Sequence, residues 1–192
     1  YEEIDKRAPI KYGLSLKLNK DSHFEARTYQ AEAIDTCLKK ESGIIRIATG
    51  GGKTLIIGRI AGEMNIKTVI YVIGIELLYQ MKDTMEALFP NTKIGIVGDG
   101  QCDIQDITIA TVWSAAAAFN KKITMIDSDL TPESPKKTKL INKQSVRNMV
   151  NESELIIIDE CQYAAAETIQ FLHRESYNAR HRFLFSGTPW RE

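Results

Sequence analysis

The fold of this 192-residue chain is decided by one stretch of eight residues, Ile47-Ala48-Thr49-Gly50-Gly51-Gly52-Lys53-Thr54. A short apolar run precedes the stretch, and a helical pattern at residues 55–61 follows it. Strand, glycine loop and helix in this order are typical of a phosphate-binding loop. The glycines let the backbone adopt left-handed angles and bring its N–H groups close to phosphate oxygens. The positive end of the helix dipole, at about Thr54, faces the same anion.

Each polar residue of this loop has a predicted role. Residues 49–52 are predicted to wrap the phosphates, Lys53 to reach the β- and γ-phosphates, and the Thr54 hydroxyl to bind Mg²⁺. The alternative is a glycine-rich turn whose lysine is merely solvated, and the strand and helix flanks argue against it. The strict pattern has glycine where Ile47 stands, so the loop is not of the GTPase form.

A second group of polar residues follows another apolar run. Asp159 and Glu160 come directly after four aliphatic residues, 155–158. An acid at the tip of a buried strand can hold Mg²⁺ through water, and its neighbour can polarise an attacking water as a general base. An acidic turn that caps a strand is the alternative, and the phosphate loop about 100 residues upstream makes it much weaker. The later sequence Ser186-Gly187-Thr188-Pro189 is either an ordinary turn or a hydroxyl-bearing loop that senses the nucleotide.

Apolar strands alternate with helical patterns through most of the chain, which predicts an α/β fold with a doubly wound, mostly parallel sheet. Residues with chemical roles should then lie at the carboxyl ends of the strands. The predicted strands are 44–48, 68–73, 93–97, 107–110, 155–158 and 182–185, and the predicted helices are 27–38, 54–64, 75–88, 111–119, 141–151 and 164–174.

Two segments lie outside this alternation. Residues 1–26 are predicted to be an N-terminal extension, and period-two alternation at 10–18 predicts a half-buried strand within it. The lysine-containing stretch 127–139 is loop-like, and a solvated insertion is favoured there over a nucleic-acid contact.

The amino-acid composition limits the classes of protein to which the chain can belong. The chain has 43% hydrophobic and 26% charged residues, which suits a globular domain. No apolar run approaches the length of roughly 20 residues that a membrane span needs. Its 25 basic and 25 acidic residues give zero net charge, which argues against a wholesale basic nucleic-acid binder but leaves room for a local basic groove. Three scattered cysteines predict reduced thiols and a cytoplasmic setting, without disulfides or zinc.

From Arg27 to about Arg191, the order of these motifs resembles the first RecA-like lobe of superfamily 2 DExH-type helicases and translocases. It is most similar to UvsW-like phage helicases and to the motor subunits of restriction systems. The resemblance implies a RecA-like P-loop NTPase lobe at residues 27–192. It also implies an ATP- and Mg²⁺-dependent activity on nucleic acid, with DNA favoured over RNA, in a bacterial or phage-infected cell.

The resemblance also implies roles for single residues. Arg27 and Gln30 match an adenine-recognising motif in which the glutamine reads the base edge. Asp159 is implied to support the metal, while Lys53, Glu160 and Gln162 are implied to take part in hydrolysis. Ser186 and Thr188 are implied to couple hydrolysis to movement, and contacts to nucleic acid are implied for Gly74, Ile75 and Thr111.

Two departures from the family pattern shape these expectations. Gln162 stands where the family usually has His or Asp, so hydrolysis is expected while its coupling to movement is in question. A second RecA-like lobe, which supplies arginines for phosphoryl transfer in this family, is not contained in these residues. This chain alone is therefore expected to bind ATP weakly and to hydrolyse it poorly. A nucleic-acid-binding or regulatory module that does not hydrolyse ATP is the alternative from another class.

Overall fold

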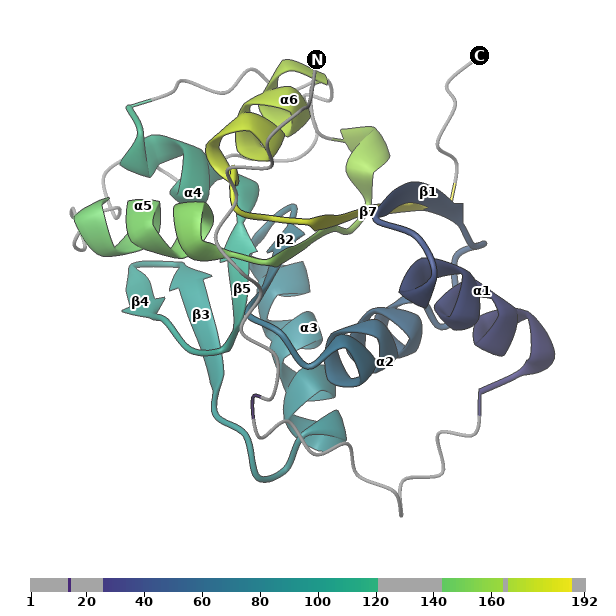
Figure 1. Ribbon diagram of the computed structural model, residues 1–192. Helices are drawn as coiled ribbons and strands as arrows, with labels where there is room; N and C mark the ends of the chain where they lie inside the picture. The colour runs from purple at the N-terminus through teal and green to yellow at the C-terminus, as the bar shows by residue number, and fades with distance from the viewer. Residues whose placement is uncertain (1–13, 15–25, 121–142, 164–165, 188–192) are drawn as a thin grey trace.

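A seven-stranded sheet forms the centre of the protein in the computed structural model, which describes residues 14, 26–120, 143–163 and 166–187 (Figure 1). The strands lie in the order β1-β7-β6-β2-β5-β3-β4. Neighbouring strands pair in parallel except β3 and β4, which are antiparallel. The predicted doubly wound, mostly parallel α/β fold is thereby confirmed. The strands are β1 (Ser42–Arg46), β2 (Thr68–Val72), β3 (Ile94–Gly98), β4 (Gln101–Asp103), β5 (Ile107–Thr111), β6 (Leu155–Ile158) and β7 (His181–Ser186).

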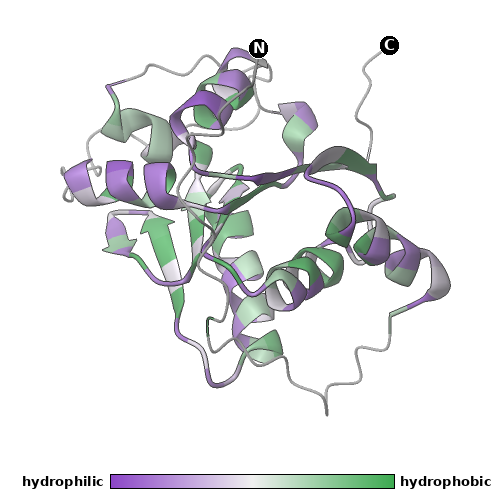
Figure 2. Cartoon of the chain, in the orientation of Figure 1, coloured by the Kyte–Doolittle hydropathy of each residue, from purple (hydrophilic) through white to green (hydrophobic). Residues whose placement is uncertain are grey.

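Three helices cover each face of the sheet (Figure 1). On the first face lie α1 (Thr28–Leu38), α2 (Lys53–Met64) and α3 (Ile75–Leu88). On the second face lie α4 (Val112–Ala118), α5 (Lys143–Glu152) and α6 (Ala166–Glu175). In Figure 2 the central strands are mostly hydrophobic, whereas the helices carry both hydrophilic and hydrophobic residues.

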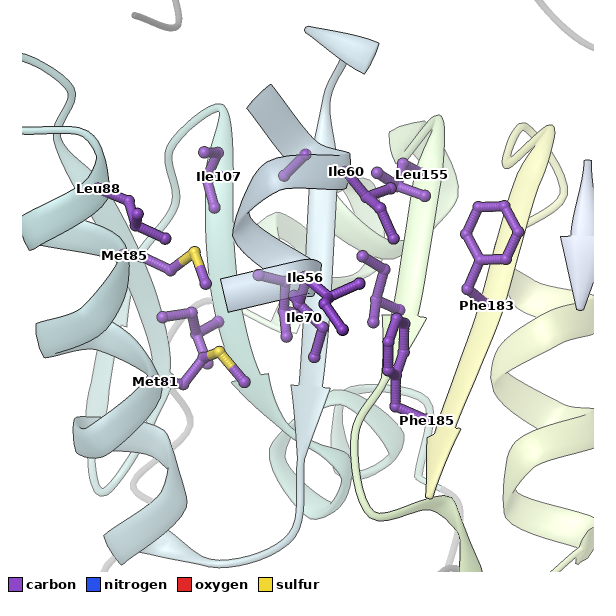
Figure 3. Close-up of a cluster of buried hydrophobic side chains, with 14 of the residues drawn as sticks. Ile56, Ile60, Ile70, Met81, Met85, Leu88, Ile107, Leu155, Phe183 and Phe185 are labelled. Atoms are coloured by element: carbon purple, nitrogen blue, oxygen red, sulfur yellow. The ribbon is translucent and has the colours of Figure 1, made fainter. Parts of the chain in front are cut away.

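Alternation along the central strands builds a separate hydrophobic core on each face. On β2, Ile70 and Val72 belong to the first core, whereas Val69 and Tyr71 belong to the second. Figure 3 shows the first core, in which the Met81–Met85–Leu88 side of α3 and the Ile56–Ile60 side of α2 meet the sheet. Strands β2, β5 and β6 are buried along their whole length. They therefore read as continuous apolar runs in the sequence.

The structure corrects several predicted boundaries. The short strand β4, which pairs with β3, was not predicted, because its three residues are too few to show an alternating pattern. Strand β1 ends at Arg46, two residues before its predicted end, and the turn of the glycine loop begins at Thr49. The helix predicted at 164–174 is described as α6 from Ala166 and extends one residue further, to Glu175, while residues 164–165 lie outside the described residues. A 3₁₀ turn, η1 (Cys161–Tyr163), comes before these two residues.

Two predicted segments cannot be compared with the structure. The strand predicted at 10–18 lies outside the described residues except for Leu14, which is not in a strand. The lysine-containing stretch 127–139 also lies outside them.

Parallel pairing brings together segments far apart in the sequence at the carboxyl edge of the sheet. β1 pairs with β7 so that Arg46 lies opposite Ser186, and β7 pairs with β6 so that Leu184 lies opposite Ile158. The loop after β1, the acidic pair after β6 and the hydroxyl-bearing loop after β7 therefore leave the same edge on three adjacent strands.

Arg182 lies near the start of β7, at the end of the strand opposite that edge, and anchors it. Its guanidinium group donates hydrogen bonds to three backbone carbonyls at and beyond the C-terminus of α6: Nε to Ala179 at 2.9 Å, Nη2 to Ser176 at 2.8 Å, and Nη1 to His173. A cation is favourable at this end of a helix, whose last carbonyls have no partner within the helix. Arg182 thus ties the start of β7 to the end of α6.

Replacing Arg182 with Met should lower the free energy of unfolding by about 2 kcal/mol, because the three carbonyls lose a charged donor. For a domain of this size, the melting temperature should fall by roughly 5 °C. Thermal unfolding followed by circular dichroism measures this, with Arg174→Met, at a mostly exposed side chain, as the control. A melting temperature equal to that of the control would show that water replaces the guanidinium without cost.

Candidate nucleotide-binding site

The loop between β1 and α2 has a backbone that only glycine suits. Gly50 and Gly52 both have a φ of 77°, which lies in the left-handed region that other residues avoid. Gly51 donates a hydrogen bond from its N–H to the Ala48 carbonyl at 2.9 Å. A Cβ on Gly51 would lie 2.5 Å from the Ile47 Cγ2 atom, so a side chain there would collide with the loop itself. Helix α2 starts at Lys53, one residue before the predicted start.

Lys53 and Glu160 form an ion pair across the site, with 2.6 Å between the Lys53 Nζ and Glu160 Oε1 atoms. The Lys53 side chain is 9% exposed and that of Glu160 is 20% exposed, so solvent screens this pair only weakly. Glu160 has a φ of 50°, an uncommon conformation for a residue with a side chain. The structure therefore brings the predicted phosphate-binding lysine into direct contact with the predicted general base.

Asp159 is buried beside this pair. Its Oδ1 atom accepts a hydrogen bond from the Glu160 N–H at 2.9 Å. The pKa of Asp159 is raised from 3.8 to about 6, first by burial and then by the Glu160 charge, against the lowering effects of that hydrogen bond and of Lys53. Burial disfavours the charged form of a carboxyl group, and a like charge nearby does the same. A nearby cation would therefore stabilise the ionised Asp159 carboxylate.

The oxygen donors of Asp159 and Thr54 fit a Mg²⁺ ion of the kind that binds with phosphates. Such an ion usually takes one or two protein oxygens and completes its shell with phosphate and water oxygens. Within the described residues, no group of three or more His, Cys, Asp and Glu could hold a metal by itself. The donor set thus suits a metal that arrives with a nucleotide.

Gln162 links the acidic pair to β7. Its Nε2 atom donates to the Glu160 Oε2 atom at 2.5 Å, and its Oε1 atom accepts from the Ser186 hydroxyl at 2.6 Å. Ser186 is fully buried at the end of β7, and Gly187 lies so close to the loop that a Cβ there would be 3.3 Å from the Thr49 Oγ1 atom. A continuous chain of contacts therefore runs from Lys53 through Glu160 and Gln162 to Ser186.

The N-terminus of α1 packs against the glycine loop. The Gln30 side chain is buried: its Oε1 atom accepts from the Arg27 N–H at 2.8 Å, and its Nε2 atom donates to the Gly51 carbonyl at 2.9 Å. Gln30, predicted to read adenine, thus has both amide atoms engaged with the protein. The Tyr29 hydroxyl donates to the same Gly51 carbonyl at 2.9 Å. The sequence places Tyr29 in the same adenine-recognising motif as Arg27 and Gln30 but predicts no separate role for it.

The residues predicted to contact nucleic acid lie at the same edge of the sheet but apart from this chain of contacts. Gly74, with a φ of 97°, precedes α3, and Ile75 is the first residue of that helix. Thr111 is fully buried, and its hydroxyl accepts from the Ser114 N–H at 3.2 Å as the N-cap of α4. Thr188 lies outside the described residues.

The chain matches a known family over most of its length. The family described as type III restriction enzyme, res subunit, matches residues 23–191. The chain belongs to this family.

Relatives of this chain include a protein named as a translocase and one named as a helicase. It is 36% identical over 114 residues to the DNA 3'-5' translocase XPB2 of Sulfurisphaera tokodaii, covering 59% of this chain and 26% of that protein. It is 31% identical over 160 residues to IRC3 of Saccharomyces cerevisiae, a candidate ATP-dependent helicase, covering 74% of this chain and 19% of that protein. The chain thus spans about a fifth to a quarter of the length of these relatives.

Among solved structures, the UvsW helicase of bacteriophage T4 has the same fold, with a TM-score of 0.65 at 18% identity over 91% of this chain and 57% of that one. The Sulfolobus solfataricus SWI2/SNF2 ATPase core in complex with dsDNA aligns with a TM-score of 0.55 at 15% identity, over 90% of this chain and 34% of that one. The predicted resemblance to a superfamily 2 RecA-like lobe is thereby confirmed. Across the described residues, no helix is both long and apolar enough to span a membrane.

Replacing Asp159 with Asn should stabilise the metal-free protein at pH 8. The pKa of this carboxyl rises from 3.8 to about 6 on folding. Such a group loses stability as pH rises through that window, and the cost persists above it. The asparagine variant avoids a cost of about 2 kcal/mol and should melt several degrees higher at pH 8. Toward pH 3 and below, under both pKa values, the difference should vanish, because the wild-type carboxyl is then protonated in both states.

Thermal unfolding with a chelator present, at pH 8 and at about pH 3, measures this effect. Asp106→Asn, at an exposed aspartate, is the matched control. It should change the melting temperature little at either pH. An Asp159→Asn variant less stable than wild type at pH 8 would contradict the account of the buried charge.

Proposed function

We propose that this chain is the N-terminal ATP-binding lobe of an ATP-dependent DNA helicase or translocase. In this proposal it binds Mg²⁺–ATP and couples hydrolysis to movement on nucleic acid. The observation that carries the proposal is the chain of contacts Lys53–Glu160–Gln162–Ser186, because it joins a phosphate-binding lysine to a general base and then to the next strand loop. Such a chain of contacts is not expected for an ordinary glycine-rich turn.

Binding of a nucleotide should exchange one partner of Lys53 for another. In the structure, the lysine neutralises Glu160 in a poorly solvated pocket. The phosphates of ATP carry more negative charge than one carboxylate and also gain the N–H groups of the loop and the start of α2. Lys53 would therefore turn to the phosphates, and Glu160 would be freed to orient and deprotonate the attacking water.

The metal in this proposal is held by Asp159 and Thr54 together with the phosphates. When bound, Mg²⁺ supplies positive charge that neutralises the phosphate oxygens. Asp159 stays ionised beside such a cation, against the effect of its burial. In this proposal Glu160 would position the attacking water, and Gln162 would hold Glu160 and the β7 loop in place.

Coupling to movement is assigned to Ser186 and Thr188, through Gln162. When Lys53 leaves Glu160, the Glu160 carboxylate can shift, and the Gln162 amide transmits that shift to the Ser186 hydroxyl. A glutamine can both donate and accept here, so the link does not require a titratable group. Gly74, Ile75 and Thr111 stay proposed nucleic-acid contacts, with Thr111 limited to a contact through neighbouring atoms because its side chain is buried.

The proposed partners follow from the relatives of the chain. XPB2 is named as a DNA translocase, and the SWI2/SNF2 core was solved with dsDNA, which supports DNA over RNA as the polymer. The res-subunit family supports a restriction-type motor as the alternative setting of the same lobe. A second RecA-like lobe is the proposed protein partner. Lys53 is the cation that the described residues place within ion-pair distance of Glu160. Turnover without the arginines of a second lobe should therefore be slow.

Nucleotide binding tests the first half of the proposal. Replacing Lys53 with Ala should weaken Mg²⁺–ATP binding at least about tenfold, since it removes a charged contact to the phosphates. Glu160→Gln should retain binding or tighten it slightly, because the lysine no longer has a carboxylate competing for it. Isothermal titration calorimetry compares the two with Lys39→Ala, at an exposed helix lysine, as the control. Equal affinity of wild type and the Lys53 variant would refute the site.

Turnover tests the second half. Phosphate release by the chain should be slow alone and should rise with one polymer among single-stranded DNA, duplex DNA, forked DNA and RNA. Glu160→Gln should reduce whatever rate is found by about a hundredfold or more, because the general base is lost. If the variant leaves the rate unchanged, the alternative of a binding module without hydrolysis is the better description.

A further inference from the structure

The carbonyl group of Gly51 is held by two donors from the first turn of α1. The Tyr29 hydroxyl and the Gln30 Nε2 atom each lie 2.9 Å from its oxygen. The next residue of the loop also touches Gln30 closely, since a Cβ on Gly52 would lie 2.5 Å from the Gln30 Nε2 atom. One backbone oxygen in a loop of three consecutive glycines thus receives two side-chain hydrogen bonds.

The direction of this carbonyl decides what the next N–H group can do. In a trans peptide the C=O and the following N–H point in opposite directions. A Gly51 carbonyl turned toward α1 therefore turns the Gly52 N–H away from α1, toward the side of the loop where a phosphate would sit. The reversed peptide would place a partial negative charge there, which repels an anion.

Glycine makes this orientation easy to lose. Without a Cβ, residues 50–52 can exchange positive for negative φ at little steric cost, so the Gly51–Gly52 peptide could rotate. The loop is also exposed at Thr49 and Gly50. A hydrogen bond from outside the loop can hold the Gly51–Gly52 peptide in one of its two orientations.

We infer that Tyr29 is a positioning residue for the phosphate loop: its hydroxyl, together with the Gln30 amide, fixes the Gly51–Gly52 peptide with its N–H toward the bound phosphates. The inference rests on the proposed nucleotide function of the site. It assigns to the first turn of α1 a role toward the polyphosphate, distinct from the base recognition expected of Arg27 and Gln30. The tyrosine is suited to this role because Arg27 Nη1 lies 3.4 Å from its oxygen as a donor, which leaves the hydroxyl proton for Gly51.

The two possible roles of Tyr29 differ in which ligands they affect. The residue is 41% exposed, so a base contact through its ring is the competing explanation. Replacing Tyr29 with Phe keeps the ring and removes the hydroxyl. If the hydroxyl positions the loop, Tyr29→Phe should weaken the binding of ATP, GTP and inorganic tripolyphosphate by a common factor of about three to ten. The ratio of the ATP affinity to the GTP affinity should stay unchanged.

Calorimetric titration of the three Mg²⁺-bound ligands provides the first readout, with Tyr177→Phe, at a tyrosine 57% exposed, as the matched control. Hydrogen–deuterium exchange of the ligand-free protein provides the second. The peptide covering residues 48–54 should exchange faster in Tyr29→Phe, while the central strands β2 and β6 should be unchanged. A general loss of stability would instead speed exchange throughout.

Each other result overturns the inference. Affinities within about twofold of wild type for all three ligands would show that the hydroxyl positions nothing. A loss confined to ATP, with tripolyphosphate unaffected, would make Tyr29 a base contact. If wild type binds none of the three ligands, the proposed function fails by itself; unchanged exchange at residues 48–54 would then overturn the inference separately.

Discussion

Parallel pairing of β1, β7 and β6 is the constraint on which the whole site depends. Hydrogen bonds between these strands place three loops from distant parts of the sequence on one edge of the sheet. The ion pair between Lys53 and Glu160 therefore joins two residues that are far apart in the sequence. Strand β6 is fully buried. Its four aliphatic residues lie between Glu154 and Asp159, so a slip in register would draw one of these acidic residues into the sheet, which is costly and specifies the position of the acidic pair.

The site combines groups that are costly to bury with contacts that only partly compensate them. Asp159 is nearly inaccessible, and its raised pKa shows that its charge is not fully stabilised by the protein. Glu160 adopts a left-handed backbone and balances its charge against a single lysine. Strain and unbalanced charge of this kind are tolerated where a ligand later supplies the missing interaction. The resting site is consistent with a protein that is completed by its nucleotide.

The contacts around the loop divide between two neighbours. On one side, α1 holds the Gly51 carbonyl through Tyr29 and Gln30. On the other side, Gly187 after β7 lies against Thr49. The phosphate loop is thus touched both by the helix expected to meet the base and by the strand expected to respond to hydrolysis. A change in the conformation of the loop on nucleotide binding would therefore act directly on α1 and on the end of β7.

The sequence by itself determined the fold class, the strand and helix order and the residues of the phosphate and acidic motifs. Apolar periodicity and glycine spacing are local properties, and Asp159, Glu160 and Lys53 carry chemistry that few other residues offer at such positions. The antiparallel strand β4 escaped prediction because it has three residues, which are too few to show the alternation that marks a strand. Tertiary structure alone decided that Gln30 and Tyr29 share one carbonyl and that Thr111 turns inward. It also decided that Gln162 bridges Glu160 and Ser186. Such contacts depend on side-chain directions between elements that are adjacent only after the sheet has formed, and no spacing along the chain encodes them.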